Sequence, residues 1–378
     1  MKILIITLGC RTNQAESDKI ADELAAQGFT VTSNEADNKP DAGYKNPEVF
    51  RPQDSGIDLI IINTCAVTGV AERKSRHQIS KISRRYPNAK IIVLGCAAEN
   101  DATQFNNANV IKTFGADKSG VVQFVLGHAG ESGIRWETKS GKCKNITGHT
   151  KQVFIKVQDG CDNKCSFCII NVLRGRSKSR GMRDILDEIG QILPRYASHT
   201  PEIVLTGINL SQYCDDDRGL IDLCDAVNRL CIEFGIRFRL SSLYCDILTP
   251  GFINTLSVME NFVPKFHLSL QSGSDKVLRD MNRRYTTAEF EEAVKNLRNA
   301  FSKNNECYIS ADVIVGFPTE GEEEFAETRR FLERLNLDHL HIFPYSPRPG
   351  TPAAEMKQIL PRIVNQRAKA LAAKNGGT

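Results

Sequence analysis

Three short apolar runs in the first third of the chain end in the same way, in a cysteine. They are Ile3–Cys10, Asp58–Cys65 and Ala89–Cys96. Each is a continuous stretch rich in β-branched residues, which is typical of a strand buried on both faces of a parallel sheet. Helical patterns follow over Gln14–Gln27 and Ala71–Tyr86. The alternation predicts an open parallel α/β sheet over residues 1–127, with a cysteine at the carboxyl end of each strand, where such sheets bind ligands.

A second series of strands and helices fills the rest of the chain. We expect its strands at Val153–Val157, Ile203–Thr206, Phe238–Ser241, Phe266–Leu270, Ile309–Val315 and Leu340–Phe343. Helical patterns separate them at Arg183–Arg195, Leu220–Phe234, Thr287–Phe301 and Glu322–Leu335. Six such β/α units predict a partial barrel over residues 151–348, open on one side. Residues 128–150 have scattered glycines and mixed charge and are expected to be a linker, and residues 349–378 a tail with a helix.

The composition fits a globular protein and excludes disorder or a collagen-like repeat, with 41% hydrophobic and 25% charged residues among 378. The formal net charge of +4 is too small by itself to require a nucleic-acid partner. No apolar stretch approaches the ~18 residues that cross a bilayer, and the apolar start of the chain is too short for a signal peptide. We therefore expect a cytoplasmic protein without a membrane partner. Thiols stay reduced there, so the twelve cysteines suggest metal or redox chemistry.

The strongest single motif is Cys161-x3-Cys165-x2-Cys168, directly after the first strand of the second series. Three thiolates on one tight loop can bind three irons of a cubane cluster and leave the fourth iron open to a small molecule. A structural zinc site is the alternative, but it needs a fourth ligand, and neither His149 nor His199 has ligand-like spacing to the trio. Thiols packed in a core without a metal are less favoured, because polar residues surround the three cysteines.

With this trio at the first loop of a six-stranded β/α unit, the chain resembles the radical S-adenosylmethionine (radical SAM) enzymes. Further motifs resemble those of the methylthiotransferases within that family. They are LGCRTNQAES (8–17), INTCAVTGVAERKSR (62–76), LGCAA (94–98), QDGCDNKCSFCII (158–170), RGRSKSR (174–180), EIVLTGINL (202–210), LSLQSGSDKVLRDMNRRYT (268–286), DVIVGFPTE (312–320) and FPYSPRPGTPA (343–353). INTCAVT followed by RKSR is most similar to the enzymes that act on threonylcarbamoyladenosine in tRNA.

The resemblance implies a fold, cofactors and a reaction. It implies an open α/β domain followed by a partial (β/α)6, TIM-like radical SAM barrel. It implies two [4Fe-4S] clusters, one held by Cys161, Cys165 and Cys168 and a second held by Cys10, Cys65 and Cys96. S-adenosylmethionine bound at the first cluster would yield a radical, and a methylthio group would be added to C2 of N6-threonylcarbamoyladenosine beside the tRNA anticodon. It also implies a one-electron donor such as flavodoxin or ferredoxin.

A lone cysteine is more often a small buried apolar residue than a ligand. Three cysteines that converge at the strand ends of one sheet favour the ligand interpretation instead. The six remaining cysteines match no motif and are expected to be structural: Cys143, Cys214, Cys224, Cys231, Cys245 and Cys307.

Candidate S-adenosylmethionine contacts lie at the ends of barrel strands, where ligand loops belong. They are Gly207, Asn209, Ser241, Gln271 and Gly316. Each could equally be an ordinary turn or barrel-closing residue, and no catalytic residue is assigned beyond the cluster ligands.

Two groups of basic residues adjoin the cysteine loops and are candidates for contact with tRNA phosphates. One group is Arg73, Lys74, Arg76, Lys81, Arg84 and Arg85, and the other is Arg174, Arg176, Lys178 and Arg180. Basic helices are usually solvated faces, which is the alternative for both groups.

The chain departs from the resembled family at three points. Asn171 stands where a proline is usual, and Tyr244-Cys245 stand where a Glu-Pro pair is usual, which removes a carboxylate from a barrel loop. The all-β RNA-binding domain called TRAM, usual at the end of the family, is not expected here. Alternatives are therefore methylthiolation of another tRNA adenosine or of a ribosomal-protein side chain, or a shortened non-catalytic member that binds iron–sulfur clusters or tRNA.

Overall fold

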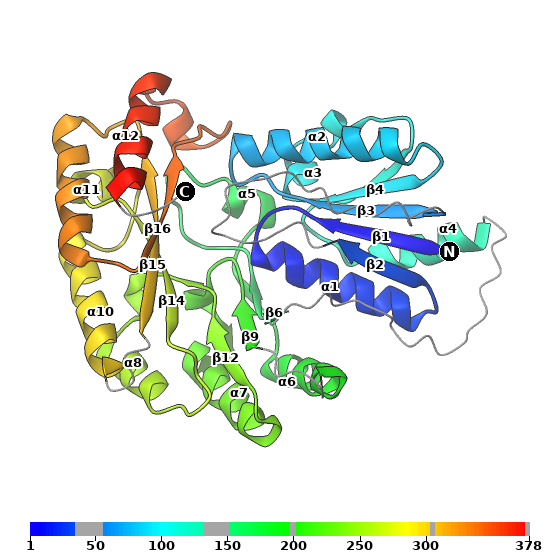
Figure 1. Ribbon diagram of the computed structural model, residues 1–378, viewed down its shortest axis with the longest axis horizontal. Helices are drawn as coiled ribbons and strands as arrows, with labels where there is room; N and C mark the ends of the chain where they lie inside the picture. Colours follow the sequence, from blue (N-terminus) through cyan, green and yellow to red (C-terminus); the bar gives the residue numbers. More distant parts are fainter. Residues whose placement is uncertain (35–55, 132–151, 197–201, 303–306, 375–378) are drawn as a thin grey trace. The chain divides into compact units, whose positions relative to one another are not determined.

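The computed structural model describes residues 1–34, 56–131, 152–196, 202–302 and 307–374 (Figure 1). By its contacts the chain divides into two compact units. The first contains Met1–Thr150 together with Val172–Arg174, and the second contains Lys151–Asn171 and Gly175–Thr378. Most of the expected linker, including Cys143 and His149, lies outside the described residues, and its first residues are helical because α4 (Val121–Glu131) continues into it.

The first unit is built on a five-stranded parallel sheet with the strand order β2-β1-β3-β4-β5. The strands are β1 (Lys2–Thr7), β2 (Thr30–Asn34), β3 (Leu59–Thr64), β4 (Lys90–Gly95) and β5 (Val110–Thr113). The three central strands are the predicted ones, and β3 is buried along its whole length. The edge strands β2 and β5 were not predicted, because each is short and partly polar and has a neighbour on one side only.

Helices cover both faces of this sheet. They are α1 (Arg11–Ala26), α2 (Gly69–Arg85), α3 (Cys96–Asn100) and α4. Leu24 of α1 and Val125 of α4 belong to one apolar cluster with Ile3, Ile5 and Ile61, so α1 and α4 share a face. In Figure 1 α2 lies on the opposite side of the sheet from α1. The expected open α/β domain is confirmed.

The second unit contains the six predicted parallel strands in sequential order. They are β6 (Gln152–Lys156), β9 (Glu202–Thr206), β12 (Arg237–Leu240), which continues as β13 (Ser242–Leu243), β14 (Lys265–Gln271), β15 (Tyr308–Val315) and β16 (His339–Pro344). β12 pairs with β9 and β13 pairs with β14, so the chain passes from one sheet to the next at Ser241. Parallel strands in sequential order with helices between them form the predicted partial barrel.

Amphipathic helices cover the outer face of the barrel strands. They are α6 (Met182–Ile192), α7 (Leu220–Phe234), α8 (Pro250–Ser257), α10 (Thr287–Ala300) and α11 (Glu322–Leu335). Phe290, Leu297 and Phe331 pack in one large core with Phe238 and Phe266. The expected tail helix is α12 (Pro361–Lys374), in which Arg367 donates to the Glu320 carboxylate at 2.8 Å.

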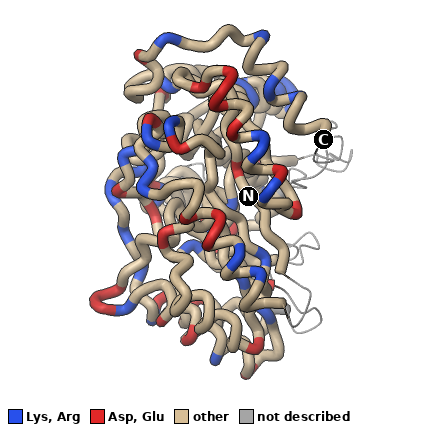
Figure 2. The backbone as a smooth tube through the Cα atoms, turned by 90° about the vertical axis from the view of Figure 1, so that its left-hand side faces the viewer, with Lys and Arg blue, Asp and Glu red and all other residues tan. Residues whose placement is uncertain are grey.

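Charges of both signs alternate over the side of the chain where α10 and α11 lie, as Figure 2 shows. The two ends of α11 differ in charge, with Glu322, Glu323 and Glu324 in its first turn and Arg334 in its last. Such an order complements the helix dipole and favours the helix itself. Within the described residues, no helix combines the length and the apolar character needed to span a membrane.

Candidate metal centres

The first cysteine trio lies at the carboxyl ends of three neighbouring strands. Register pairs Thr7 of β1 with Asn63 of β3, and Thr64 of β3 with Gly95 of β4. Cys65 and Cys96 follow β3 and β4 directly, and Cys10 lies after β1, directly before the first residue of α1. The strand order changes direction between β1 and β3, and ligands bind at such a point in open α/β sheets.

A glycine and an asparagine bring the loops of this trio together. Gly9 has a φ of +114°, and a Cβ atom there would lie 2.5 Å from the Cβ of Cys65, so only glycine permits this approach. The Asn13 side-chain amide donates to the carbonyls of Leu8 (3.0 Å) and Thr64 (2.9 Å). These bonds tie the loop after β1 to the end of β3.

Arg174 completes this site from a different part of the sequence. Its Nε donates to Cys96 Sγ at 3.2 Å, and its Nη atoms donate to Glu16 Oε1 at 2.8 Å and to Asn13 Oδ1 at 2.9 Å. Glu16 also pairs with Lys118, and the Arg174 side chain is fully buried. The prediction that Arg174 contacts tRNA phosphates is therefore wrong, because a buried carboxylate already holds its guanidinium.

Burial governs the protonation of two cysteines of this trio, Cys65 and Cys96. It raises the pKa of the Cys65 thiol to about 12, with the neighbouring Cys10 adding to the effect. Burial also raises the pKa of Cys96, against the opposing charge of Arg174. A bound metal ion deprotonates a coordinating thiol, so such buried thiols become thiolates when metal binds.

The second trio lies on one loop after β6. Two short strands, β7 (Gln158–Asp159) and β8 (Lys178–Ser179), pair antiparallel and close the base of this loop. The Cys161 N–H donates to the Gly175 carbonyl at 3.0 Å. Gly160 has a φ of +69°, and a Cβ atom there would lie 2.0 Å from the Arg176 carbonyl oxygen. The loop is therefore closed by its own backbone.

Contacts to later parts of the barrel unit hold the middle of the loop. Ser166 donates from its N–H to the Met281 carbonyl (3.1 Å) and accepts from the Ala353 N–H through its own carbonyl (2.9 Å). The Asn282 amide donates to the Lys164 carbonyl at 2.7 Å. Asn171, where the resembled family usually has proline, donates back to the Asn163 carbonyl at 3.4 Å.

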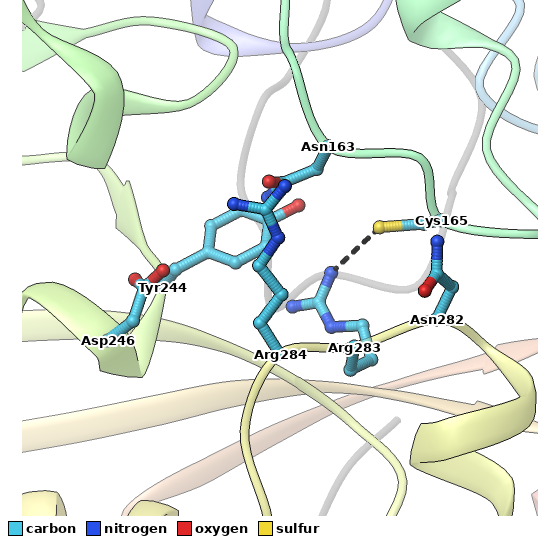
Figure 3. A pocket seen from close by; sticks show the side chains of 7 residues that line it. All are labelled: Asn163, Cys165, Tyr244, Asp246, Asn282, Arg283 and Arg284. Atoms are coloured by element: carbon cyan, nitrogen blue, oxygen red, sulfur yellow. Dashed lines mark hydrogen bonds between the residues drawn. The ribbon is translucent and has the colours of Figure 1, made fainter.

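Hydrogen-bond donors point at the sulfurs of this second trio. The Asn163 N–H and the Asn209 amide lie 3.4 Å and 3.6 Å from Cys161 Sγ. Arg283 Nη1 lies 3.3 Å from Cys165 Sγ, the bond drawn as a dashed line in Figure 3. Burial raises the pKa of Cys168 to about 11, and it raises the pKa of Cys161 as well. Donors of this kind stabilise sulfur that carries negative charge.

The donor sets fit iron–sulfur clusters. Among the residues that the structure describes, no three His, Cys, Asp or Glu side chains converge as ligands of one metal ion. A cubane cluster does not need that convergence, because each thiolate binds a different iron. Each site combines three cysteines with an arginine that donates to one sulfur, Arg174 being buried and Arg283 partly buried, and this arrangement suits an anionic thiolate-bound cluster better than three neutral thiols.

Two of the candidate S-adenosylmethionine contacts have unused polar atoms. Asn209 Oδ1 and Ser241 Oγ are buried and have no hydrogen-bond partner among the described residues. They follow the neighbouring strands β9 and β12. Gly207 lies where a Cβ atom would be 2.9 Å from Gln158 Oε1, the oxygen that accepts from the Asn209 N–H. Buried polar atoms of this kind are suited to a polar ligand.

The other two candidates, Gln271 and Gly316, have backbone conformations or contacts that the fold itself requires. Gln271 ends β14 with a φ of +74°. The Gly316 N–H donates to Glu320 at 2.8 Å, and a Cβ atom on Gly316 would lie 2.5 Å from Val364 of α12. The geometry of Gly316 therefore follows from close packing of α12, so its N–H is already used within the protein.

Most of the candidate basic residues are exposed. In α2 the exposed ones are Arg73, Lys74, Lys81, Arg84 and Arg85, whereas Arg76 donates to Gln104 at 2.7 Å. After the second trio, Lys178 and Arg176 are exposed, the latter with a side chain 94% exposed. Arg180 is partly buried and pairs with Glu188 at 2.6 Å.

Among the cysteines expected to be structural, Cys224, Cys231 and Cys245 are buried, and Cys214 is exposed.

Sequence reasoning missed Glu16, Arg283 and Tyr244 as parts of the two sites. Glu16 and Arg283 lie inside quoted motifs, but their spacing to the cysteines gave no indication of contact.

Comparisons with known proteins agree with this architecture. Residues 155–332 match the radical SAM superfamily, and residues 41–115 match the uncharacterized protein family UPF0004. A "Threonylcarbamoyladenosine tRNA methylthiotransferase MtaB" from Chlamydia pneumoniae is 34% identical over 97% of this chain and 80% of its own length. One from Aquifex aeolicus is 33% identical over 98% and 87%. A "tRNA-2-methylthio-N(6)-dimethylallyladenosine synthase" from Bifidobacterium adolescentis is 33% identical over 97% and 75%.

Solved structures support the fold alone. The radical S-adenosylmethionine methyltransferase TsrM from Kitasatospora setae aligns with a TM-score of 0.63 at 13% identity, over 93% of this chain and 74% of its own. The cobalamin-dependent radical enzyme OxsB aligns with a TM-score of 0.57 at 13% identity, over 100% and 56%. Taken with the sequence relatives, which match over nearly the whole chain, these findings show that the chain belongs to the radical SAM methylthiotransferase family.

Proposed function

We propose that the chain adds a methylthio group to C2 of N6-threonylcarbamoyladenosine in tRNA, as the names of its tRNA methylthiotransferase relatives describe. The observation that carries the proposal is the pair of cysteine trios, each with an arginine donating to a sulfur. A tRNA-modifying enzyme of this type works in the cytoplasm. In this proposal residues 1–127 form the domain that holds the cluster of Cys10, Cys65 and Cys96. Residues 151–348 form the radical SAM core.

In this proposal Cys161, Cys165 and Cys168 hold one [4Fe-4S] cluster, and Cys10, Cys65 and Cys96 hold the other. When bound, the clusters and S-adenosylmethionine supply the one-electron and sulfur chemistry that replaces an unactivated aromatic C–H bond. The chain positions these groups. Asn209 and Ser241 offer unpaired buried oxygens for the polar parts of S-adenosylmethionine, and the hydrogen-bonded loop keeps Cys161 and Cys165 in place.

The exposed basic residues of α2 are the proposed contacts for the phosphates of the anticodon arm. Five of them are exposed and follow Cys65 within one helix: Arg73, Lys74, Lys81, Arg84 and Arg85. Arg176 and Lys178 are candidates on the barrel unit. The electrons would come from a low-potential carrier protein such as flavodoxin or ferredoxin.

Mass spectrometry of tRNA nucleosides from a deletion strain tests the substrate. We expect the 2-methylthio form of threonylcarbamoyladenosine to disappear and the unmethylthiolated form to accumulate, with restoration by the plasmid-borne gene. Unchanged levels of the methylthiolated nucleoside would exclude the proposal. The same spectra measure 2-methylthio-dimethylallyladenosine, the product named for relatives of similar identity, and loss of that nucleoside alone would assign this second substrate.

Production of 5′-deoxyadenosine separates an enzyme from a binding protein. Purified, anaerobically reconstituted protein with a chemical reductant and S-adenosylmethionine should release it. A protein that binds clusters and tRNA but releases none would be a non-catalytic member of the family.

A further inference from the structure

The guanidinium of Arg283 is bonded in an unusual way for a partly buried cation. Arg283 lies three residues after α9 (Asp275–Asp280), and each of its three guanidinium nitrogens donates one hydrogen bond. Nη1 donates to Cys165 Sγ at 3.3 Å, Nη2 to the Ser269 carbonyl at 2.7 Å, and Nε to the Tyr285 hydroxyl at 2.9 Å. All of these acceptors are neutral unless Cys165 is a thiolate.

Two aromatic rings complete the surroundings of this guanidinium. Its carbon lies 4.2 Å from the ring centroid of Tyr244 and 4.9 Å from that of Tyr285. Asp246 lines the same small pocket but forms no ion pair with Arg283, and no other carboxylate does so among the described residues (Figure 3). The positive charge is thus held by rings and neutral acceptors, and a negative charge on the sulfur side is its natural counterpart.

We propose that Arg283 is a positioning residue that raises the reduction potential of the cluster bound by Cys161, Cys165 and Cys168. This inference depends on the proposed cluster at that trio. Reduction adds one electron, and therefore one negative charge, beside a partly buried cation, where the attraction is stronger than in bulk water. The potentials of iron–sulfur clusters depend on nearby charge and on hydrogen bonds to the sulfurs, and Arg283 supplies both.

The electron balance is simple. In the test, dithionite or titanium(III) citrate gives up the one electron that the cluster accepts, and Arg283 neither gains nor loses a proton. No bond at Arg283 is formed or broken. The arginine changes only the relative free energies of the oxidised and the reduced states.

The test measures midpoint potentials by EPR-monitored redox titration in the full chain, with Cys10, Cys65 and Cys96 replaced by alanine so that a single cluster titrates. Arg283→Met should shift the midpoint to a more negative value, and Arg283→Lys, which keeps the charge, should shift it less. Tyr244→Glu places a carboxylate beside the intact guanidinium and should also shift the potential to a more negative value. Tyr244→Phe keeps the ring and should leave the potential unchanged.

Arg284→Met is the matched control. Arg284 lines the same pocket and carries the same charge, but it is exposed and donates to no sulfur in the described part of the chain. If the midpoint moves no more in Arg283→Met and Tyr244→Glu than in Arg284→Met, the inference fails while the cluster assignment survives. The protein that keeps Cys161, Cys165 and Cys168 and has no further substitution in the barrel unit is the reference. If this reference protein binds no cluster, the proposed function fails, and the inference fails with it. Tyr244→Glu keeps the test decisive if Arg283→Met does not fold.

Discussion

The two cysteine trios reach similar donor sets by opposite routes. Cys10, Cys65 and Cys96 come from three separate segments and meet because β1, β3 and β4 lie side by side in register. Cys161, Cys165 and Cys168 lie on one loop that its own backbone closes. The first trio therefore depends entirely on the tertiary fold of a sheet. The second lies on a locally closed loop that distant residues of the barrel unit support, so single changes should affect the two trios differently.

The two arginines that donate to the sulfurs of these trios also differ in their surroundings. Arg174 is held in a buried network of opposite charges with Glu16 and Lys118. Apart from the sulfur of Cys165, Arg283 is held by one carbonyl oxygen, one hydroxyl oxygen and two aromatic rings. Removing Arg174 breaks a buried ion pair with Glu16, whereas removing Arg283 breaks only hydrogen bonds to a carbonyl, a hydroxyl and a sulfur. We expect Arg174 to matter most for stability and Arg283 most for redox properties.

The largest expected effect is a separation of two activities by single cysteine substitutions. Cys161→Ala should abolish release of 5′-deoxyadenosine, whereas Cys10→Ala should keep that release and abolish methylthio transfer to tRNA. Each variant should lose about four irons per chain, because a cubane cluster needs its thiolates. Iron assays and mass spectrometry of both products measure this. The control is Cys214→Ala, which changes an exposed cysteine outside both trios; methylthiolated tRNA from both trio variants would disprove the two-cluster assignment.

The next effect tests the charge network. Arg174→Met should destabilise the iron-free protein by about 3 kcal/mol, because it breaks the buried ion pair with Glu16 and the hydrogen bond to Asn13. Urea-induced unfolding followed by circular dichroism measures the loss. Arg176→Met, two residues along the chain with an exposed side chain, should change stability by less than about 0.5 kcal/mol. Equal effects of the two substitutions would show that the buried network contributes no stability.

A smaller loss of stability is expected at the other arginine. Arg283→Met should cost about 1–2 kcal/mol in the same unfolding experiment, since it leaves the Ser269 carbonyl without this donor but no charge unpaired. Differential scanning calorimetry of the iron-free protein provides an independent measurement. A loss greater than that of Arg174→Met would reverse the comparison between the two arginines.

The smallest effect compares two helix caps, one in each unit. Thr68 caps α2 through a single bond from the Ala71 N–H (3.1 Å), whereas Thr286 and Glu289 cap α10 reciprocally. Thr68→Ala and Thr286→Ala should each cost about 1 kcal/mol near neutral pH. Hydrogen bonds from Thr286 lower the pKa of Glu289 below its ordinary 4.5, so this carboxylate stabilises the fold above that value and loses its effect as the pH falls through the lowered pKa.

The measurement is thermal unfolding of both variants between pH 7 and about pH 3. The cost of Thr286→Ala should shrink toward the acid end, and the cost of Thr68→Ala should stay nearly constant, because its cap bond joins a hydroxyl oxygen to the Ala71 N–H. Parallel pH profiles for the two variants would contradict this assignment.

Much of this fold could be predicted from patterns that the chain carries locally. Continuous apolar runs identified β1, β3 and β4, and their common ending in cysteine identified the meeting point of the first trio. The edge strand β5 escaped prediction because an edge strand needs little apolar sequence. Six β/α alternations were enough for the barrel, since parallel strands with helices between them have few ways to pack.

The charged partners could not be predicted, because they depend on contacts distant in sequence. Arg174 belongs to the basic run R-G-R-S-K-S-R and looks no different from Arg176, yet it bonds to Glu16, 158 residues away. Arg283 and Arg284 are adjacent and chemically identical in sequence, and only the turn of the backbone sends one to Cys165. Gly316 invited a ligand interpretation, but the side chain of Val364 occupies its surroundings.

Residues Val172–Arg174 group by their contacts with the first unit, although residues on both sides of them belong to the second. Dividing the chain at the expected linker, residues 128–150, would therefore separate Arg174 from the site of Cys10, Cys65 and Cys96. A fragment that stops at residue 150 would retain Glu16 and Cys96 but lack the arginine that bonds to both. The complementary fragment would expose the guanidinium of Arg174, which is buried in the whole chain. Expression of the halves together, or of a single uncut polypeptide, is the sound starting point for biochemistry on either centre.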